Sequence, residues 1–541
     1  MSTIKISYKD TTKEYEKGVS LNEILKDFKD NYKHDVLAGS INGRVTGLDS
    51  IVNKDSKIDF YDIASVAGEK VYERGILFLF CVAVKQLLNC DVKILYDYDD
   101  GIYCEILANN LISEVTIEKI KMKMRDLIAD EIPITKVMVS SSDAIDYYSK
   151  IGQSDKSNSL KYVGNSSINL YKLGDDLDYF YGVLPNNTKV LKKYSLKYLK
   201  DNKVILSMPN SDSVDDYDNY KINKNDKLTA IIEVTNNYLQ ELKINNSAEL
   251  NRMIADGNYG DLIRISETLF NNSVLKLAND ISKNKDIKIV LITGTSSSGK
   301  LTISKKLETF LKMKGLEPIS ISTSDFLIDG KNDDNIEAID TSLFNEVVSK
   351  LLNKEEVEMP KYNFVLGKRE KTGSKIKLND NGILIIEGIY SFNEKLTEMI
   401  PNKNKYKVYA STFTPLAIDN HNMFKQEDIR LLRRIVRNKL FSSIPVSITL
   451  SKIKDIRNES RTIFKYINES DFIIDTSLAY ELSVLKTYVE PLLFSVDEKD
   501  ENYEEAIRLI NLFRVILGIP SEDVPKDSAL REFIGGSCFK Y

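Results

Sequence analysis

The stretch IKIVLITGTSSSGKLTISKKLETFLKMKG, residues 287–315, decides the fold. It begins with an apolar, β-branched run at 287–293, which is typical of a strand buried on both faces. A loop rich in glycine and serine follows at 294–299, and then a helix that Gly315 ends. This order of strand, loop and helix is the context that a phosphate-binding loop requires. It predicts an α/β fold with a parallel sheet.

The loop matches the phosphate-binding pattern G-x-x-x-x-G-K-[ST] at all but its last position. Position 301 is leucine, and the hydroxyl expected there for magnesium comes one residue later, at Thr302. One step along a helix turns a side chain by about 100°, so Thr302 does not simply replace that hydroxyl. The alternative is a glycine–serine turn before an ordinary helix. The residues predicted to bind nucleotide phosphate are Gly294, Ser296, Ser297, Ser298, Gly299, Lys300 and Thr302.

A second apolar strand, GILIIEG at 382–388, carries an acid near its end. Ligands of open α/β sheets bind at the carboxyl ends of the strands. We therefore predict that Glu387 faces the phosphates and holds magnesium, either directly or through water. The alternative is a surface glutamate that follows a core strand.

The segment RLLRRIVRN, residues 430–438, spaces its arginines at i, i+3, i+4 and i+7, so they share one face of a predicted helix. The other face is apolar. A guanidinium group suits phosphate oxygens, and a kinase lid brings positive charge to the transferred group. The alternative is a solvated face on a surface helix. The residues predicted to recognise phosphate are Arg430, Arg433, Arg434 and Arg437.

The rest of the chain predicts smaller modules around this α/β domain. TIKISY reads as a strand, SLNEILKDF as a short helix opened by Ser20, and KIDFYDIAS as a closing strand, an order typical of a ubiquitin-like β-grasp module. An apolar helix at 68–88, a pair of strands at 92–107 and a helix at 113–131 follow. The predicted domains are a β-grasp module at 1–64, an α+β domain at 65–225, a helical connector at 226–285, the α/β domain at 286–495 and a helical tail at 496–541.

Composition narrows the class of protein. The formal net charge of −5 over 541 residues gives no bulk-basic signature of a nucleic-acid partner, although a local patch stays open. The longest apolar run, at 75–84, is far shorter than the roughly 20 residues of a membrane helix. The four cysteines form no disulfide framework, and no signal pattern stands at the N-terminus, so we expect a cytoplasmic protein without a membrane partner. Two histidines, His34 and His421, are too few for a multi-histidine metal site.

Several segments together resemble the bacterial nucleoside kinases of the uridine kinase/phosphoribulokinase family. They include LITGTSSSGK (291–300), ISTSDFLID (321–329), EVEMPKYNFVLGKR (356–369), LIIEGIYSFNEKLTEMIP (384–401), DIRLLRRIVR (428–437) and LREFIGGS (530–537). The resemblance implies transfer of a phosphoryl group from ATP, with Mg²⁺, to the 5′-hydroxyl of a uridine- or cytidine-type nucleoside. It also leaves a homo-oligomer open, because relatives of this fold commonly self-associate.

The resemblance assigns roles to individual residues. The implied catalytic residues are Lys300, Asp325, Glu387, Arg434 and Arg437, and the implied magnesium ligands are Glu387 and Asp325. The implied substrate-binding residues are Tyr362, Arg369, Arg430 and Arg433.

Several positions depart from the family pattern. Besides Leu301, Ser324 stands where the family has its catalytic aspartate, and the acid comes one place late at Asp325. The segment after it is shortened to IDGKNDDN, and Asn438, Leu440 and Ser442 replace an aspartate and two arginines. Loss of a general base costs roughly 10²–10⁴-fold in rate. Two interpretations stay open: an active kinase with a shifted arrangement, and a catalytically weak relative that binds nucleotide and has a regulatory role.

The N-terminal modules resemble the TGS domain and the second domain of threonyl-tRNA synthetases. GVSLNEIL and INGRVTGLDSIV carry the first resemblance. In the second domain, the synthetases bear H-x-x-x-H on the first helix, whereas the helix at 68–88 has no histidine, so the editing chemistry is not carried over. A third interpretation, an RNA- or tRNA-associated factor acting through the TGS module, is disfavoured by the acidic net charge but stays open.

Overall fold

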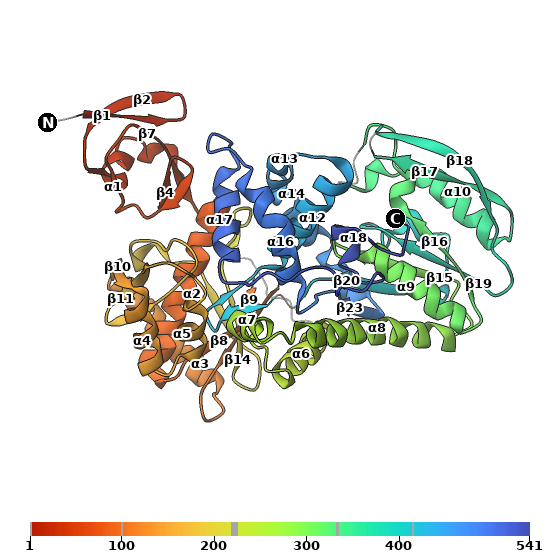
Figure 1. Ribbon diagram of the computed structural model, residues 1–541, viewed down its shortest axis with the longest axis horizontal. Helices are drawn as coiled ribbons and strands as arrows, with labels where there is room; N and C mark the ends of the chain where they lie inside the picture. The colour runs from red at the N-terminus through yellow and green to blue at the C-terminus, as the bar shows by residue number, and fades with distance from the viewer. Residues whose placement is uncertain are drawn as a thin grey trace.

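The computed structural model describes residues 3–98, 101–217, 226–331, 335–364, 366–413 and 416–540. The N-terminal modules lie at one end and a parallel sheet lies at the other (Figure 1). Helices from the C-terminal part of the chain, α16 (Glu481–Phe494) and α17 (Tyr503–Phe513), stand between them.

The first module is a five-stranded sheet with one short helix packed on it. Its strands are β1 (Thr3–Tyr8), β2 (Thr11–Glu16), β4 (Val36–Ile41), β5 (Arg44–Thr46) and β7 (Ser56–Asp62), in the spatial order β2-β1-β7-β4-β5 with β1 and β7 parallel. Helix α1 (Leu21–Leu25) is opened by Ser20, whose hydroxyl caps the helix while Glu23 returns the bond. The predicted opening strand, capped helix and closing strand are confirmed.

The second module contains a long buried helix and an antiparallel sheet. Helix α2 (Val66–Leu88) packs against α3 (Glu114–Ala129), and the sheet has the order β13-β14-β9-β8. These strands are β8 (Val92–Tyr98), β9 (Gly101–Ile106), β13 (Ser195–Tyr198) and β14 (Lys203–Ser207). The two helices and the β8–β9 pair stand where the sequence predicts them. No helix in the described part of the chain has the length and apolarity needed to span a membrane.

Three helices lead from this module to the parallel sheet: α6 (Asp226–Glu241), α7 (Ser247–Ala255) and α8 (Tyr259–Lys283). Helix α8 packs against strand β23 and against the helix after the phosphate loop, so it lies along the sheet (Figure 1). The predicted helical connector is therefore helical in structure. Residues 218–225, at its start, fall outside the described residues.

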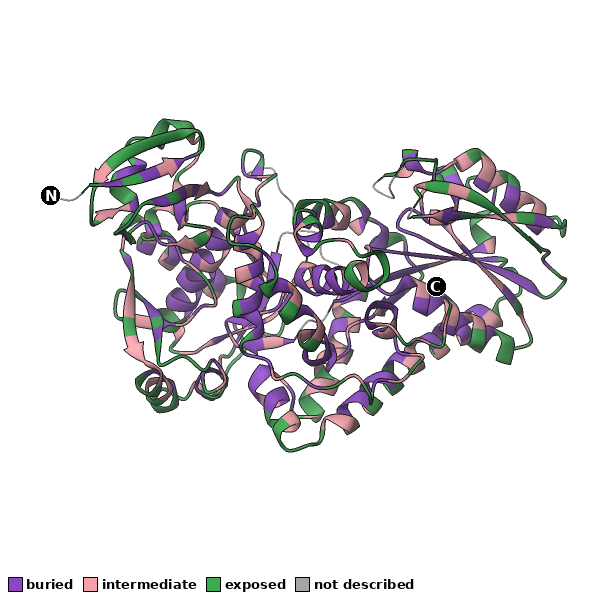
Figure 2. Cartoon of the chain, turned by 45° about the horizontal axis from the view of Figure 1, so that its top comes forward, coloured by how far each residue is buried: buried purple, intermediate pink, exposed green. Residues whose placement is uncertain are grey.

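The parallel sheet has the order β16-β19-β15-β20-β23. Its strands are β15 (Ile289–Gly294), β16 (Glu317–Ser322), β19 (Gly382–Glu387), β20 (Lys405–Ser411) and β23 (Phe472–Asp475), and each pair of neighbours is parallel. Every residue of β15 and β19 is buried, as their apolar sequences predict (Figure 2). The central position of β15 places the loop after it at the middle of the carboxyl edge.

Helices and a hairpin from the following segments pack around the sheet. They are α9 (Lys300–Met313), α10 (Thr341–Leu352), the hairpin of β17 (Val357–Asn363) and β18 (Lys368–Ile376), α12 (Gln426–Ser442), α14 (Ile453–Phe464) and α18 (Arg531–Ile534). Helix α17 packs on α16, and α18 packs on α12. The segment predicted as a C-terminal tail is thus part of the main core, and its α18 reaches the phosphate loop.

A buried network of charges joins the second module to the α/β domain. His421 lies in the turn before β22 (Asn422–Met423); its Nδ1 is 2.6 Å from Asp178 and 2.7 Å from Lys156 Nζ, and its Nε2 is 2.8 Å from Asp91. Burial opposes a charge on the imidazole, but Cys81, Asp178 and Asp91 hold the pKa of His421 well above its usual range. The histidine is therefore part of a domain contact.

A second contact between distant parts of the chain should make stability depend on pH. Tyr61 donates a 2.5 Å hydrogen bond to Glu504 on α17, and burial raises the pKa of Glu504 to about 7. An acid with a raised folded pKa contributes stability that is complete below its unfolded pKa and is lost as pH rises through about 7. We expect Glu504→Gln to abolish this loss. The melting temperature of the wild type should fall relative to that of Glu504→Gln between pH 5 and 8.

The exposed acid Glu501 provides the control for that measurement. Glu501→Gln removes the same charge from the same region and should keep the wild-type pH profile. If wild type and Glu504→Gln show parallel profiles from pH 5 to 8, then the contact between Tyr61 and Glu504 does not titrate as described.

Candidate phosphate-binding site

Two glycines shape the loop between β15 and α9. Gly294 has φ +154°, and a Cβ added there would lie 2.1 Å from the carbonyl oxygen of Ala410 on the next strand. Gly299 has φ +81° and caps helix α9. Both positions therefore require glycine, because one has no room for a side chain and the other has a left-handed backbone. The loop opens at the N-terminus of α9, where backbone N–H groups favour an anion.

Polar groups converge inside this loop without protein partners. Lys300 is only 8% exposed, and its Nζ donates a 2.8 Å hydrogen bond to the carbonyl of Thr295. Among the described residues, the buried hydroxyls that find no hydrogen-bond partner include those of Thr295, Ser296, Ser297 and Ser298. Buried polar groups are normally paired. Four adjacent unpaired hydroxyls next to a lysine therefore fit a phosphate group, and the structure brings the predicted loop residues together.

Two carboxylates stand at the neighbouring strand ends. Burial raises the pKa of Glu387, a rise that Lys300 opposes and that Glu532 and Asp325 reinforce. Burial likewise raises the pKa of Asp325, which Lys361 opposes at 3.5 Å. The predicted acids Glu387 and Asp325 thus lie in one electrostatic environment with Lys300.

The predicted substrate residues lie on the hairpin next to these acids. The N–H of Tyr362 donates to Asp325 Oδ1 at 3.4 Å, and its hydroxyl donates to the Lys331 carbonyl at 2.9 Å. Arg369 stands opposite Tyr362 in the hairpin register and pairs with Asp340 at 3.1 Å. Tyr362 is therefore close to Asp325, whereas Arg369 is engaged by another acid.

The residues present do not complete a magnesium site. No group of three or more histidines, cysteines and acids that could hold a metal occurs in the described ranges. Leu301 has no ligand atom, and the hydroxyl of Thr302 donates to Glu532 Oε2 at 2.9 Å. Mg²⁺ in phosphoryl-transfer sites takes much of its coordination from water and phosphates, so Glu387 and Asp325 remain the predicted ligands.

Two of the four arginines predicted to recognise phosphate are buried, because α12 packs in the core. Arg433 is 0% exposed; it pairs with Glu481 at 2.7 Å and donates to the carbonyl of Ser297 at 3.2 Å. Arg430 is 2% exposed and lies 3.6 Å from Glu459. Both guanidinium groups are buried against acids of the chain, and contact of either with a substrate stays a prediction. Arg433 donates to the loop at Ser297, and Arg430 donates to α14 at Ile456.

The other two arginines of α12 are partly exposed. Arg434 is neither fully buried nor fully exposed, and Arg437 lies 3.9 Å from Glu532. Their contact with a transferred phosphoryl group stays a prediction.

Sequence reasoning missed two acids at the loop, Glu459 and Glu532. The N–H of Ser296 donates to Glu459 Oε1, and the N–H of Thr302 lies 3.4 Å from Glu532 Oε2. Glu532 belongs to LREFIGGS, a segment singled out for its resemblance. Because this segment carries the resemblance although it is far from the loop in sequence, its acid could have been predicted to lie at the site. Glu459 has no such signal.

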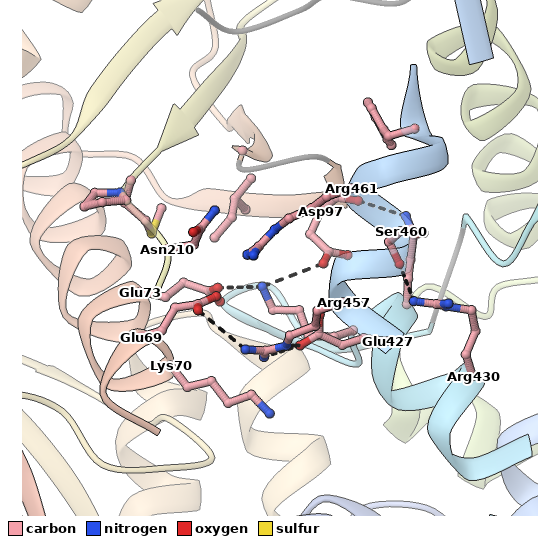
Figure 3. A pocket seen from close by; sticks show the side chains of 17 residues that line it. Glu69, Lys70, Glu73, Asp97, Asn210, Glu427, Arg430, Arg457, Ser460 and Arg461 are labelled. Carbon is pink, nitrogen blue, oxygen red and sulfur yellow. Dashed lines mark hydrogen bonds and ion pairs between the residues drawn. The ribbon is translucent and has the colours of Figure 1, made fainter. Parts of the chain in front are cut away.

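A charged cavity of about 130 Å³ lies between the second module and the α/β domain (Figure 3). Glu69 and Glu73 of α2 face Glu427 of α12 and Arg457 of α14 across it. Lys425 pairs with Glu73 at 2.7 Å, so ion pairs cross the domain boundary here. The cavity and the phosphate loop thus share helix α14 as a wall.

The fold and the loop together define an α/β protein of the phosphate-binding-loop class. The model of the phosphoribulokinase / uridine kinase family matches residues 329–420. Threonine–tRNA ligase of Clostridioides difficile is 25% identical over 197 residues, covering 36% of this chain and 31% of the ligase. Threonine–tRNA ligase 1 of Bacillus subtilis is 24% identical over 197 residues, covering 36% of this chain and 30% of that ligase. This chain thus spans about a third of the length of these relatives.

Two solved kinases show weak structural similarity to this chain. A fructose transport system kinase from Silicibacter is 16% identical, with a TM-score of 0.29 over 37% of this chain and 98% of the other. A possible uridine kinase from Bacillus stearothermophilus is 16% identical, with a TM-score of 0.27 over 38% and 98%. From the sequence matches, residues 329–420 are similar to the phosphoribulokinase / uridine kinase family, and a region that covers 36% of the chain is similar to threonine–tRNA ligase.

Proposed function

We propose that the α/β domain binds ATP at loop 294–302 and transfers its terminal phosphoryl group to the 5′-hydroxyl of a uridine- or cytidine-type nucleoside. One observation carries this proposal: Lys300 and four unpartnered hydroxyls converge in a glycine-shaped loop at the carboxyl edge of a parallel sheet. Amides, hydroxyls and an ammonium group at a helix N-terminus bind phosphate oxygens.

In this proposal the residues divide the chemistry between them. The loop amides and Lys300 hold the phosphates, and Arg434 and Arg437 neutralise charge on the transferred group. Asp325 accepts the proton of the acceptor hydroxyl. The oxygen of that hydroxyl forms the new bond to phosphorus as the bond between phosphorus and the ADP oxygen breaks. The raised pKa of Asp325 makes it a stronger base than an exposed carboxylate. Tyr362, whose backbone N–H donates to Asp325, is the residue that we propose contacts the nucleoside.

The test is incubation of the protein with ATP, magnesium and each nucleoside, followed by measurement of nucleoside monophosphate and ADP. Formation of both supports the proposal. A second candidate, a nucleotide-binding relative with weak transfer, is favoured by Leu301 and by the engagement of Thr302 with Glu532. It predicts that ATP raises the melting temperature while no monophosphate forms.

Restoring the two missing groups should increase transfer. We expect Leu301→Thr together with Ser324→Asp to raise the rate on the order of 100-fold, because a metal ligand and a base return to their family positions. Initial rates of monophosphate formation measure this. Leu301→Ala with Ser324→Ala is the control, since it changes the same positions without adding a ligand or a base. Equal rates in both double variants would mean that these departures do not limit transfer.

One observation bears on an RNA-associated role. A groove of about 520 Å³ on the second module contains Lys121, Arg125 and Lys192, and no acidic residue is among those that line this groove in the described part of the chain. A basic groove suits a phosphate backbone. The homology to threonine–tRNA ligase makes tRNA the ligand to test. Copurified tRNA that stays bound at moderate salt supports this candidate, and its absence counts against it.

A further inference from the structure

The phosphate loop already contacts two anions that belong to the chain. The N–H of Ser296 donates to the carboxylate of Glu459, and Glu532 accepts from the N–H and the hydroxyl of Thr302 at 3.4 and 2.9 Å. These donors lie where a phosphate-binding loop meets its ligand. A carboxylate offers two oxygen acceptors to them, as a phosphate does. Carboxylates of the chain therefore occupy donors of the loop that a bound phosphate would use.

Glu459 is held at the loop from two sides. It lies on α14, and its Oε1 is 3.6 Å from Arg430 Nη1. Arg430 is itself attached to α14, since it donates to the carbonyl of Ile456 at 3.0 Å and to the hydroxyl of Ser460. The side chain of Glu459 is 14% exposed. This arrangement fixes the carboxylate against the Ser296 amide.

The same helix carries two arginines to the cavity between the domains. Arg457 and Arg461 are each two residues from Glu459, which is about 200° around a helix, so they point to the opposite side. Arg457 pairs with Glu427 and lies 3.5 Å from Glu69 of α2 (Figure 3). Arg461 pairs with Asp212. A displacement of α14 would therefore move Glu459 and these domain contacts together.

We propose that Glu459 is an internal competitor for nucleotide phosphate, and that ATP binds fully only when α14 carries Glu459 away from Ser296. The inference rests on the proposed function, because it concerns access to the same loop. It also makes nucleotide affinity depend on how the second module packs against α14.

The test compares binding of ATP and of tripolyphosphate by calorimetry. Glu459→Gln keeps the shape and an acceptor atom but removes the charge, so both ligands should bind about tenfold more tightly than to the wild type. Asp455→Asn is the matched control, because Asp455 is an acid of α14 that pairs with Lys452 and does not contact the loop. It should leave both affinities within about twofold of the wild type.

The outcomes separate the inference from the proposed function. If the wild type binds ATP and Glu459→Gln binds it no more tightly, the competition is refuted and the proposed function stands. If neither protein binds ATP or tripolyphosphate, both are refuted. Binding by Glu459→Gln alone supports both.

Hydrogen exchange on the unaltered chain gives a second readout that does not depend on a variant folding. Addition of ATP should protect residues 294–302 and increase exchange in residues 453–464. Protection of the loop with unchanged exchange in α14 would overturn the inference.

Discussion

Replacement of Lys300 by alanine should lower the affinity for ATP on the order of 100-fold. The ammonium group of Lys300 is buried in the loop, where it donates to the Thr295 carbonyl. A buried charge that meets a phosphate forms a strong, charge-assisted hydrogen bond, and alanine removes it. Calorimetric titration with ATP measures the effect, with circular dichroism to confirm the fold.

Lys305→Ala is the control for this variant. Lys305 lies on the same helix and pairs with Glu308 at 2.9 Å. Its loss should leave the ATP affinity nearly unchanged, since surface ion pairs contribute little. If Lys300→Ala and wild type bind ATP equally, phosphate is not held by this loop.

Replacement of Arg433 by alanine should destabilise the α/β domain by about 3–5 kcal/mol. The guanidinium group pairs with buried Glu481, donates to the carbonyls of Ser297 and Thr476, and lies 5.0 Å from the ring centre of Phe533. Its removal leaves the Glu481 carboxylate buried without its cation. We expect the transition of this domain to fall by roughly 10 °C in calorimetry. ATP affinity should fall as well, because the loop loses its support at Ser297.

The adjacent arginine serves as the comparison. Arg434 is partly exposed on the same helix, so Arg434→Ala should keep the melting temperature close to that of the wild type and act on phosphoryl transfer instead. Equal melting temperatures for the two variants would contradict the assignment of Arg433 to the core.

The local elements were predictable because they depend on neighbours in sequence. The apolar run of β15, the glycines of the loop and the capping serine of α1 each carry a short-range signal that the structure confirms. The spacing of the arginines also gave their helix correctly. The spacing did not predict what surrounds the arginines, since helical periodicity shows which residues share a face but not what that face contacts.

The rest depended on pairs that are far apart in the chain. Arg433 meets Glu481 across 48 residues, Ser296 meets Glu459 across 163, and Lys156 meets His421 across 265. Glu481 and Glu459 are two of the 80 aspartates and glutamates in the sequence, so their partners are set only by the packing of helices and domains. For that reason the spacing of the arginines predicts their shared face but not the burial of Arg430 and Arg433 in the core.

A crystal structure of the full chain with a non-hydrolysable ATP analogue is the most direct test of nucleotide binding at this loop. The expected result places phosphate oxygens within hydrogen-bond distance of the amides between Ser296 and Lys300 and of Lys300 Nζ, with Glu459 displaced. A nucleotide bound elsewhere, with Glu459 still accepting from the Ser296 amide at a saturating concentration, would contradict it.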